Sequence, residues 1–193
     1  LDDSGVVTAT FDMAPVNVDR ARDAIAERFL GDIMQVPPMV SALKVDGKRL
    51  HQLAREGIEV ERQPRPITVH SFTVEPTAEP NVLSARIHCG SGTYVRSLGA
   101  DLGEALGGGA HIRALRRLST GPFDVSEASS IESPVLLPVE RIVAHLNGHT
   151  LDEKGIDDTL YGRVRDAFDG EDPWAVFDES GNLVAVFERF RDT

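Results

Sequence analysis

The chain has 193 residues, of which 41 % are hydrophobic and 26 % are charged, proportions that are typical of a globular protein. This length allows one well-buried domain and a small second one. No apolar run approaches the roughly 18 residues that span a bilayer, and no secretory signal is recognised. The single cysteine, Cys89, excludes an internal disulfide framework. We therefore expect a cytoplasmic protein with no membrane partner.

The formal net charge of −11 is unevenly distributed along the chain. Residues 1–123 carry 15 acidic and 14 basic side chains, whereas residues 124–193 carry 16 acidic and 6 basic ones. Within 41–123, 11 basic residues face only 8 acidic ones. Because binding of phosphates depends on local rather than total charge, the overall acidity does not exclude a nucleic acid ligand.

The first third of the chain alternates between short apolar patterns and turn signals. Val18, Ala21, Ile25 and Phe29 form the apolar stripe of an amphipathic helix. In chain order, the pattern predicts a strand at 6–11, a helix at 18–30 with Asn17 as N-cap and Gly31 as its end, an extended stretch at Pro37-Pro38, a turn at Asp46-Gly47, and a helix at 48–56 closed by Gly57.

The middle of the chain contains the clearest strands. Residues 66–76 and 81–90 alternate apolar and polar side chains, with one slip in the first strand that indicates a bulge, and a loop rich in proline joins them. We expect an antiparallel pair. A helix capped by Thr93 should follow and end at the glycines of 107–109, and an extended segment should cover 110–123.

The pattern changes after residue 123. A helix is expected at 138–148 and a hairpin at 172–190, and a domain boundary is expected at 125–137. The predicted fold class is α/β (α+β), with a largely antiparallel mixed sheet flanked by helices, followed by a small β-rich C-terminal domain.

Tyr94 and Arg96 stand two residues apart, directly after a glycine-rich loop. Two such positions lie about 200° apart on an ideal helix, so a shared patch requires a non-helical start, which Gly90 and Gly92 permit. Two interpretations remain open. Tyr94 is a core residue and Arg96 a surface residue, or Arg96 pairs with a carboxylate and holds it ionised and oriented.

Two groups of basic residues are compatible with phosphate binding. Arg113, Arg116 and Arg117 form one group, beside Leu115. The second group has only Asp46 as an opposing charge and comprises Lys44, Lys48, Arg49 and Arg55. Each group could equally be a solvated charged surface.

Several types of site are disfavoured by the pattern. The six histidines include no pair with helical ligand spacing on an unbroken helix, so we expect no metal. The glycines of 107–109 follow a helix instead of preceding one, which is not the arrangement of a phosphate loop. No G-x-S-x-G motif is present.

Three long motifs, in this order and at these separations, resemble the bacterial tRNA pseudouridine synthase B family. The stretch QVPPMVSALKVDGKRLHQLAREGIEV at 35–60 is similar to the family's Q-x-P-P-x-x-S-A-x-K-x-x-G element. The stretch GTYVRSLGADLGEALGGGAH at 92–111 resembles its G-T-Y-I-R element, and LRRLSTGPF at 115–123 resembles its L-R-R segment. The resemblance covers roughly residues 1–125.

The resemblance implies a function: isomerisation of the uridine at position 55 in the T loop of tRNA, with base flipping and without a cofactor. It implies that Arg96 pairs with the catalytic aspartate and that Tyr94 lies near the target base. It also implies that Leu115, Lys44, Arg116 and Arg117 contact the substrate. Residues 1–125 would be part of the catalytic domain, and residues 136–193 a small RNA-binding-like (PUA-like) domain.

Two departures from the family pattern are visible. Val40 stands where many relatives have tyrosine. The family's G-x-L-D-P motif, which carries the catalytic aspartate, does not occur in these residues, and Asp2 and Asp3 are not substitutes for it. We therefore expect an N-terminal segment of the same enzyme to supply the aspartate and the chain alone to be inactive. The alternatives are a catalytically silent RNA-binding module and a purely structural domain.

Overall fold

The computed structural model describes residues 6–7, 9–45 and 47–189. Two compact units divide the chain between Leu115 and Arg116. Asp2 and Asp3, to which the sequence assigns no catalytic role, and the predicted turn residue Asp46 lie outside the described residues. Among the helices of the described residues, none is both long and apolar enough to cross a membrane.

An antiparallel three-stranded sheet forms the centre of the first unit, in the order β1-β4-β5. Its strands are β1 (Gly31–Gln35), β4 (Arg65–Pro76) and β5 (Leu83–Cys89). Ile33 pairs with Ile67, and Phe72 pairs with Ile87. The register of β4 against β5 shifts between Val69 and Ser71, so both the antiparallel pair and the bulge expected from the sequence are confirmed.

The N-terminal predictions needed two corrections. The strand predicted at 6–11 is wrong, because residues 6–7 and 9–11 are neither helix nor strand. The predicted end at Gly31 is also wrong, because the helix ends at Arg28 and Gly31, with φ +77°, opens β1 instead. The strand has only five residues, and two prolines follow Val36 directly after it, so local pattern alone did not reveal this strand.

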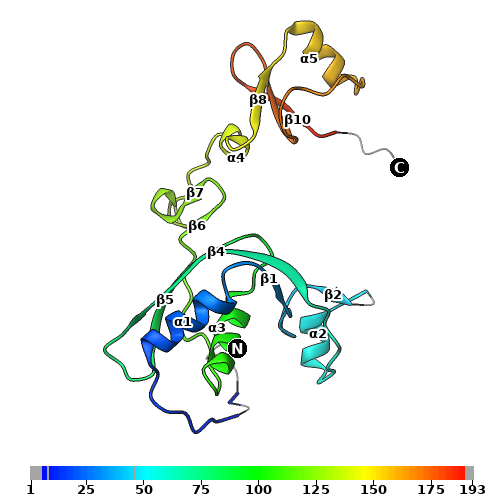
Figure 1. The fold of residues 1–193 in the computed structure, drawn as a ribbon. Coiled ribbons are helices and arrows are strands. Elements are labelled where there is room, and N and C mark those ends of the chain that lie inside the picture. The colour runs from blue at the N-terminus through cyan, green and yellow to red at the C-terminus, as the bar shows by residue number, and fades with distance from the viewer. Residues whose placement is uncertain (1–5, 8, 46, 190–193) are drawn as a thin grey trace. The chain divides into compact units, whose positions relative to one another are not determined.

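Two helices cover one face of this sheet, α1 (Val18–Arg28) and α3 (Val95–Ala105) (Figure 1). The side chain of Asn17 caps α1, as expected, by accepting hydrogen bonds from the backbone N–H groups of Asp19 and Arg20. The buried core between the helices and β4 consists of Ala21, Ile25, Phe29, Ile67, Val69, Phe72, Val74, Leu98 and Leu102. Full burial stabilises the fold by about 1.5–3 kcal/mol for each large apolar side chain.

A small hairpin and a short helix lie between β1 and β4 in the chain. They are β2 (Lys44–Val45), β3 (Lys48–Arg49) and α2 (Leu50–Arg55). The helix predicted at 48–56 therefore begins two residues later than expected, because Lys48 and Arg49 pair with β2. Leu50 and Leu53 are the buried residues of α2.

The glycines after α3 allow close approach of the N-terminal segment. A Cβ atom at Gly108 would lie 2.1 Å from the sulfur of Met13, and one at Gly109 would lie 2.4 Å from the ring of Phe11. The N–H of Gly109 also donates a hydrogen bond to the Met13 sulfur at 3.4 Å. These glycines make room for packing rather than for phosphate.

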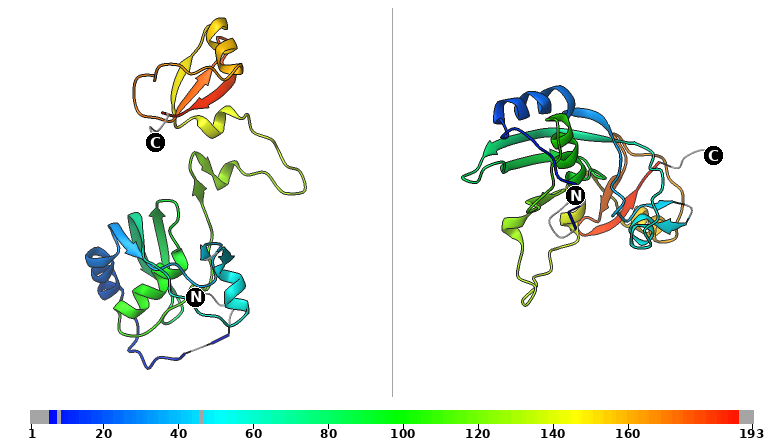
Figure 2. Two further views of the ribbon diagram at one scale, coloured as in Figure 1. Left: turned by 90° about the vertical axis from the view of Figure 1, so that its right-hand side faces the viewer. Right: turned by 90° about the horizontal axis from the view of Figure 1, so that it is seen from below.

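The second unit begins with a two-stranded pair and a short turn, β6 (Ser119–Thr120), β7 (Phe123–Asp124) and η1 (Val125–Glu127). Its larger sheet has the order β10-β9-β8, from β8 (Asn147–Thr150), β9 (Trp174–Phe177) and β10 (Leu183–Phe187) (Figure 2). The predicted hairpin is confirmed as β9 and β10, which are antiparallel, whereas β8 is parallel to β9. Trp174, Ala175 and Val176 are buried.

Predictions of helices in the second unit were less accurate. The helix expected at 138–148 is reduced to α4 (Glu140–Val143), because residues 147–150 form β8. The sequence reading also missed α5 (Glu153–Leu160), which Asp152 caps by accepting a hydrogen bond from the N–H of Gly155. The predicted extended segment 110–123 is only partly regular, with β6 and β7 at its end.

Candidate functional site

The start of α3 displays Tyr94 and Arg96. Tyr94 is the N-cap residue, with extended backbone angles φ −96° and ψ 100°, and the helix begins at Val95. Thr93 is therefore not the cap that the sequence suggested, and its buried hydroxyl has no hydrogen-bond partner among the described residues. Gly92, with φ +79°, turns the chain into this position. The non-helical start that a shared patch requires is thus present.

The backbone of Tyr94 is bonded to the side chain of Gln35, at the end of β1. The Tyr94 N–H donates to Oε1 of Gln35 at 2.8 Å, and Nε2 of Gln35 donates to the Tyr94 carbonyl at 3.1 Å. Gln35 is 3 % exposed. The sequence predicted no role for Gln35. The strand GDIMQ has no periodic pattern, and the partner of Gln35 lies 59 positions away, so local sequence gave no signal for this contact.

The segment after Gln35 offers its backbone carbonyls to side chains from two helices, α2 and α3, and from the loop before β4. These acceptors are Val36 for the Ser97 hydroxyl, Pro37 for the Arg62 guanidinium, Val40 for the Arg96 guanidinium and Ser41 for the His51 ring. The contacts measure 3.5, 3.1, 2.9 and 3.1 Å respectively. Prolines 37 and 38 are buried, so this segment is held close to α3.

Arg96 is half-buried, and its guanidinium lies against the segment just described. A guanidinium carries five N–H donors and stays charged at all physiological pH values. One of its nitrogens donates to the Val40 carbonyl at 2.9 Å. The backbone carbonyl of Val40, rather than its side chain, is the functional group here, so the absence of a tyrosine ring at position 40 does not affect this contact.

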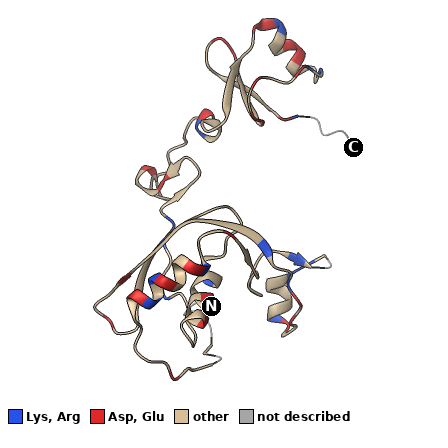
Figure 3. Ribbon diagram, viewed as in Figure 1, with Lys and Arg blue, Asp and Glu red and all other residues tan. Residues whose placement is uncertain are grey.

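Lys44 lies on the hairpin that follows this segment. In the antiparallel register Lys44 stands opposite Arg49, and Val45 stands opposite Lys48. Lys44, Lys48 and Arg49 are exposed, and Figure 3 marks the basic positions of this hairpin in blue. Because like charges on directly opposed residues repel, a bound anion would reduce the repulsion between Lys44 and Arg49.

Leu115 and the arginines around it occupy three different environments. Leu115 is 63 % exposed and is the last residue of the first unit. Arg113 forms a bidentate pair with Glu79, with contacts of 2.6 and 2.7 Å, which ties it to the loop between β4 and β5. Arg116 and Arg117 open the second unit and are exposed, and Arg117 donates to the hydroxyl of Thr120 at 3.2 Å. Arg113 is therefore already matched by a carboxylate.

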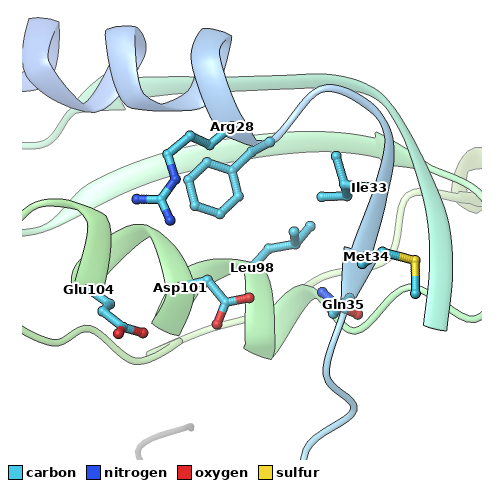
Figure 4. Close-up of a pocket in the computed structure, with 8 residues that line it drawn as sticks. Arg28, Ile33, Met34, Gln35, Leu98, Asp101 and Glu104 are labelled. Carbon is cyan, nitrogen blue, oxygen red and sulfur yellow. The ribbon is translucent and has the colours of Figure 1, made fainter. Parts of the chain in front are cut away.

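A pocket of about 400 Å³, with Gln35 in its lining, opens between α1, β1 and α3 (Figure 4). Its lining includes Phe29, Leu98, Asp101 and Glu104. Partial burial, with the nearby Glu104 carboxylate as a smaller cause, raises the pKa of Asp101 above its ordinary value. The lining carries these two carboxylates and one guanidinium, that of Arg28, and the resulting excess of negative charge disfavours phosphate. Within the described part of the chain, no three metal-ligating side chains gather at one point.

Comparison with known proteins identifies the family of proteins to which the chain belongs. Residues 1–95 match the model of the TruB family pseudouridylate synthase N-terminal domain. Residues 96–144 match the model of the tRNA pseudouridylate synthase B C-terminal domain. The chain belongs to the TruB family of pseudouridine synthases, and the family resemblance noted in the sequence is confirmed.

Curated relatives agree with this assignment. The tRNA pseudouridine synthase B of Dehalococcoides mccartyi (strain 195) is 39 % identical over 198 residues, which cover 96 % of this chain and 65 % of the relative. That of Aromatoleum aromaticum is 46 % identical over 175 residues, which cover 84 % of this chain and 55 % of the relative. The chain thus spans between half and two thirds of the length of these relatives.

Solved structures confirm the expected α+β class. A Cbf5-Nop10-Gar1 complex contains a chain that is 25 % identical, with a TM-score of 0.63, over 89 % of this chain and 55 % of that one. An H/ACA RNP bound to a substrate RNA contains a chain with a TM-score of 0.60 and 20 % identity, over 90 % of this chain and 54 % of that one. The second likeness concerns the fold alone.

Proposed function

We propose that this chain forms the arginine-bearing and RNA-binding part of an enzyme that converts uridine to pseudouridine at position 55 in the T loop of tRNA. The observation that carries the proposal is the start of α3, where Tyr94 is extended and Arg96 is half-buried, within a TruB-family chain. In this proposal the reaction is cytoplasmic and the partner is the T stem-loop.

The proposed reaction breaks the bond between N1 of uracil and C1′ of the ribose and forms a bond from C5 to C1′. The C5 proton leaves and N1 gains a proton, so the atoms balance and no oxidant or cofactor is required. The base must first leave its stack, which costs a few kcal/mol. A carboxylate from a segment outside these residues initiates the cleavage, and Arg96 keeps that carboxylate ionised and oriented.

Other predicted residues have separate roles in this proposal. Tyr94 packs beside the flipped uracil, and the exposed Leu115 lines the pocket that receives this uracil. Lys44, Arg116 and Arg117 contact phosphates. The proposal assigns residues 1–125 to the catalytic domain and 136–193 to a small PUA-like RNA-binding domain. Support comes from the exposure of Leu115, Lys44, Arg116 and Arg117 and from the excess of basic side chains on the hairpin, where Lys44 stands opposite Arg49.

Arg96→Ala tests the role of the arginine. We expect the full-length enzyme with this change to lose turnover of a T stem-loop RNA by several orders of magnitude, because removal of one member of a buried charge pair typically costs 3–5 kcal/mol. RNA affinity should fall much less. Pseudouridine is measured by carbodiimide adducts and primer-extension stops, and affinity by filter binding.

Arg20→Ala is the matched control, because Arg20 is exposed on α1 and distant in the sequence from α3. Its turnover should equal that of the wild type. Near-normal turnover of Arg96→Ala would contradict the assigned role. Tight RNA binding with no product from the unaltered full-length enzyme would instead indicate a silent RNA-binding module.

A further inference from the structure

Gln35 makes a contact that the function proposed above does not use. It is almost fully buried, and its carboxamide meets the backbone of a residue 59 positions further along the chain. The carboxamide accepts from the N–H of Tyr94 and donates to the carbonyl of the same residue. Its C=O and N–H groups thus act as one peptide unit paired with Tyr94, as in an antiparallel ladder.

This pairing explains where α3 begins. Neither Tyr94 nor Thr93 supplies a side-chain cap, so the usual stop signal is missing. The bond from Gln35 to the Tyr94 N–H holds that residue in the extended region, and the Tyr94 carbonyl already accepts from the N–H groups of Ser97 and Leu98. A carboxamide from β1 therefore replaces the local cap of α3.

The same contact links two parts of the proposed site. Val40, whose carbonyl accepts from Arg96, lies five residues after Gln35, and two buried prolines lie between them. Prolines restrict the backbone, so fixing Gln35 also restricts Val40 relative to Arg96. The direction of the Tyr94 ring and the position of the Arg96 guanidinium thus depend on one buried side chain.

We propose that Gln35 is a positioning residue, whose doubly bonded carboxamide holds Tyr94 extended and so aims Tyr94 and Arg96 at the substrate. The role in aiming at a substrate rests on the proposed function, whereas the effect on Tyr94 can be measured without it.

Gln35→Glu supplies a chemical test. A carboxylate still accepts from the Tyr94 N–H, but it has no proton to donate and repels the Tyr94 carbonyl. Protonation restores the donor. Because burial raises the pKa of a carboxyl group, we expect the variant to regain the wild-type geometry as the pH falls from about 8 to about 5.

The readout is ¹⁹F NMR of the chain labelled with 3-fluorotyrosine. The chain has two tyrosines, Tyr94 in the first unit and Tyr161 in the second, so Tyr161 is an internal control. In Gln35→Glu the Tyr94 resonance should shift at pH 8 and return at pH 5, while the Tyr161 resonance stays unchanged. The exposed Gln63 provides a matched control, and Gln63→Glu should move neither resonance.

Gln35→Met covers the case in which the glutamate variant does not fold. It keeps a similar volume but has no strong donor or acceptor, so its Tyr94 resonance should shift at every pH. A Tyr94 resonance that is unchanged in both folded variants would overturn the proposal, and so would a shift in Gln35→Glu that does not reverse with pH.

Addition of a T stem-loop RNA separates this inference from the proposed function. The wild-type Tyr94 resonance should respond to the RNA, and the response should require a several-fold higher RNA concentration in Gln35→Met. Absence of any response in the wild type would contradict the proposed function and the aiming role together, but not the effect of Gln35 on Tyr94. A wild-type response that is identical in Gln35→Met would overturn the aiming role alone.

Discussion

The backbone conformation at Tyr94 sets the direction of the Tyr94 side chain relative to that of Arg96. On a continuous helix they would point about 200° apart. Because Tyr94 is extended and α3 begins one residue later, that geometric restriction does not apply. Nothing in the local sequence specifies this, since the residue that holds Tyr94 is Gln35, on another element.

Glu79 and Arg113 provide a prediction about pH at the residue scale. The bidentate bonds from Arg113 hold the pKa of the Glu79 carboxyl below its ordinary value of 4.5. A lowered pKa in the folded state means that the pair stabilises the fold at neutral pH and that this contribution is lost as the pH falls through the folded-state pKa. The melting temperature of the wild type should therefore exceed that of Glu79→Gln at pH 7, and the difference should shrink below about pH 4.5.

Glu27→Gln is the control for that measurement, because Glu27 is exposed on α1. Its difference from the wild type should stay small at both pH values. The pair is solvent-exposed, so the effect should also weaken with added salt. A difference for Glu79→Gln that is independent of pH would contradict this account.

At the scale of elements, the hairpin of β2 and β3 is a short structure with an electrostatic cost. Lys44 and Arg49 are directly opposed, and Lys48 lies on the next pair. Two residues per strand make few ladder bonds with which to offset this repulsion. We therefore expect an RNA phosphate to neutralise basic side chains of this hairpin when RNA binds.

Lys44→Ala tests this interpretation. RNA affinity should fall at low salt, and the slope of log affinity against log salt should become shallower by about 1, because one phosphate contact is lost. The stability of the free chain should not decrease, since a repulsion is removed. Affinity measured by fluorescence anisotropy between 50 and 200 mM salt gives the slope.

Arg20→Ala is the matched control, because Arg20 is an exposed basic residue on α1 and not on the basic hairpin. It should leave the salt slope unchanged. A Lys44→Ala slope equal to that of the wild type would show that Lys44 makes no phosphate contact.

The elements also show what local pattern can reveal. The strands β4 and β5 follow from alternation over seven residues or more, and the bulge follows from the single break in the alternation of β4. The strand β1 has five residues, of which only Gln35 is buried, so it shows no periodic signal. Its pairing with β4 exists because the tertiary fold brings it there, as does the pairing of β8 with β9.

At the scale of the whole molecule, the chain has two cores. The first contains residues of α1, β4 and α3, and the buried apolar residues of the second are Val143, Leu151, Trp174, Ala175 and Val176. The excess of acidic residues falls mainly in the second unit, whereas the basic hairpin belongs to the first. Total charge therefore says little about where an anionic ligand binds.

Leu98→Ala tests whether the two cores are independent. Leu98 is 1 % exposed, so the change should lower the stability of the first unit by about 2–5 kcal/mol. The only tryptophan of the chain, Trp174, lies in the second unit. We expect the unfolding transition seen by circular dichroism to gain an earlier phase, while the transition seen by Trp174 fluorescence keeps its midpoint.

Leu115→Ala is the matched control for that experiment. Leu115 is 63 % exposed, so the same substitution should change stability by about 0.5 kcal/mol or less, yet it should reduce turnover if Leu115 lines the substrate pocket. A shift of the Trp174 transition in Leu98→Ala would show that the two units unfold as one.

The sequence by itself determined the class of fold, the strands β4 and β5, the first helix with its cap, the C-terminal hairpin and the family. These depend on periodicity, turn residues and motifs that lie within a few neighbouring positions. Only the tertiary structure decided the start of α3, the strand β1, the pairing of Arg113 with Glu79 and the contact of Gln35 with Tyr94. Each of these depends on hydrogen bonds or ion pairs between residues at least 30 positions apart, and local propensity carries no information about such partners.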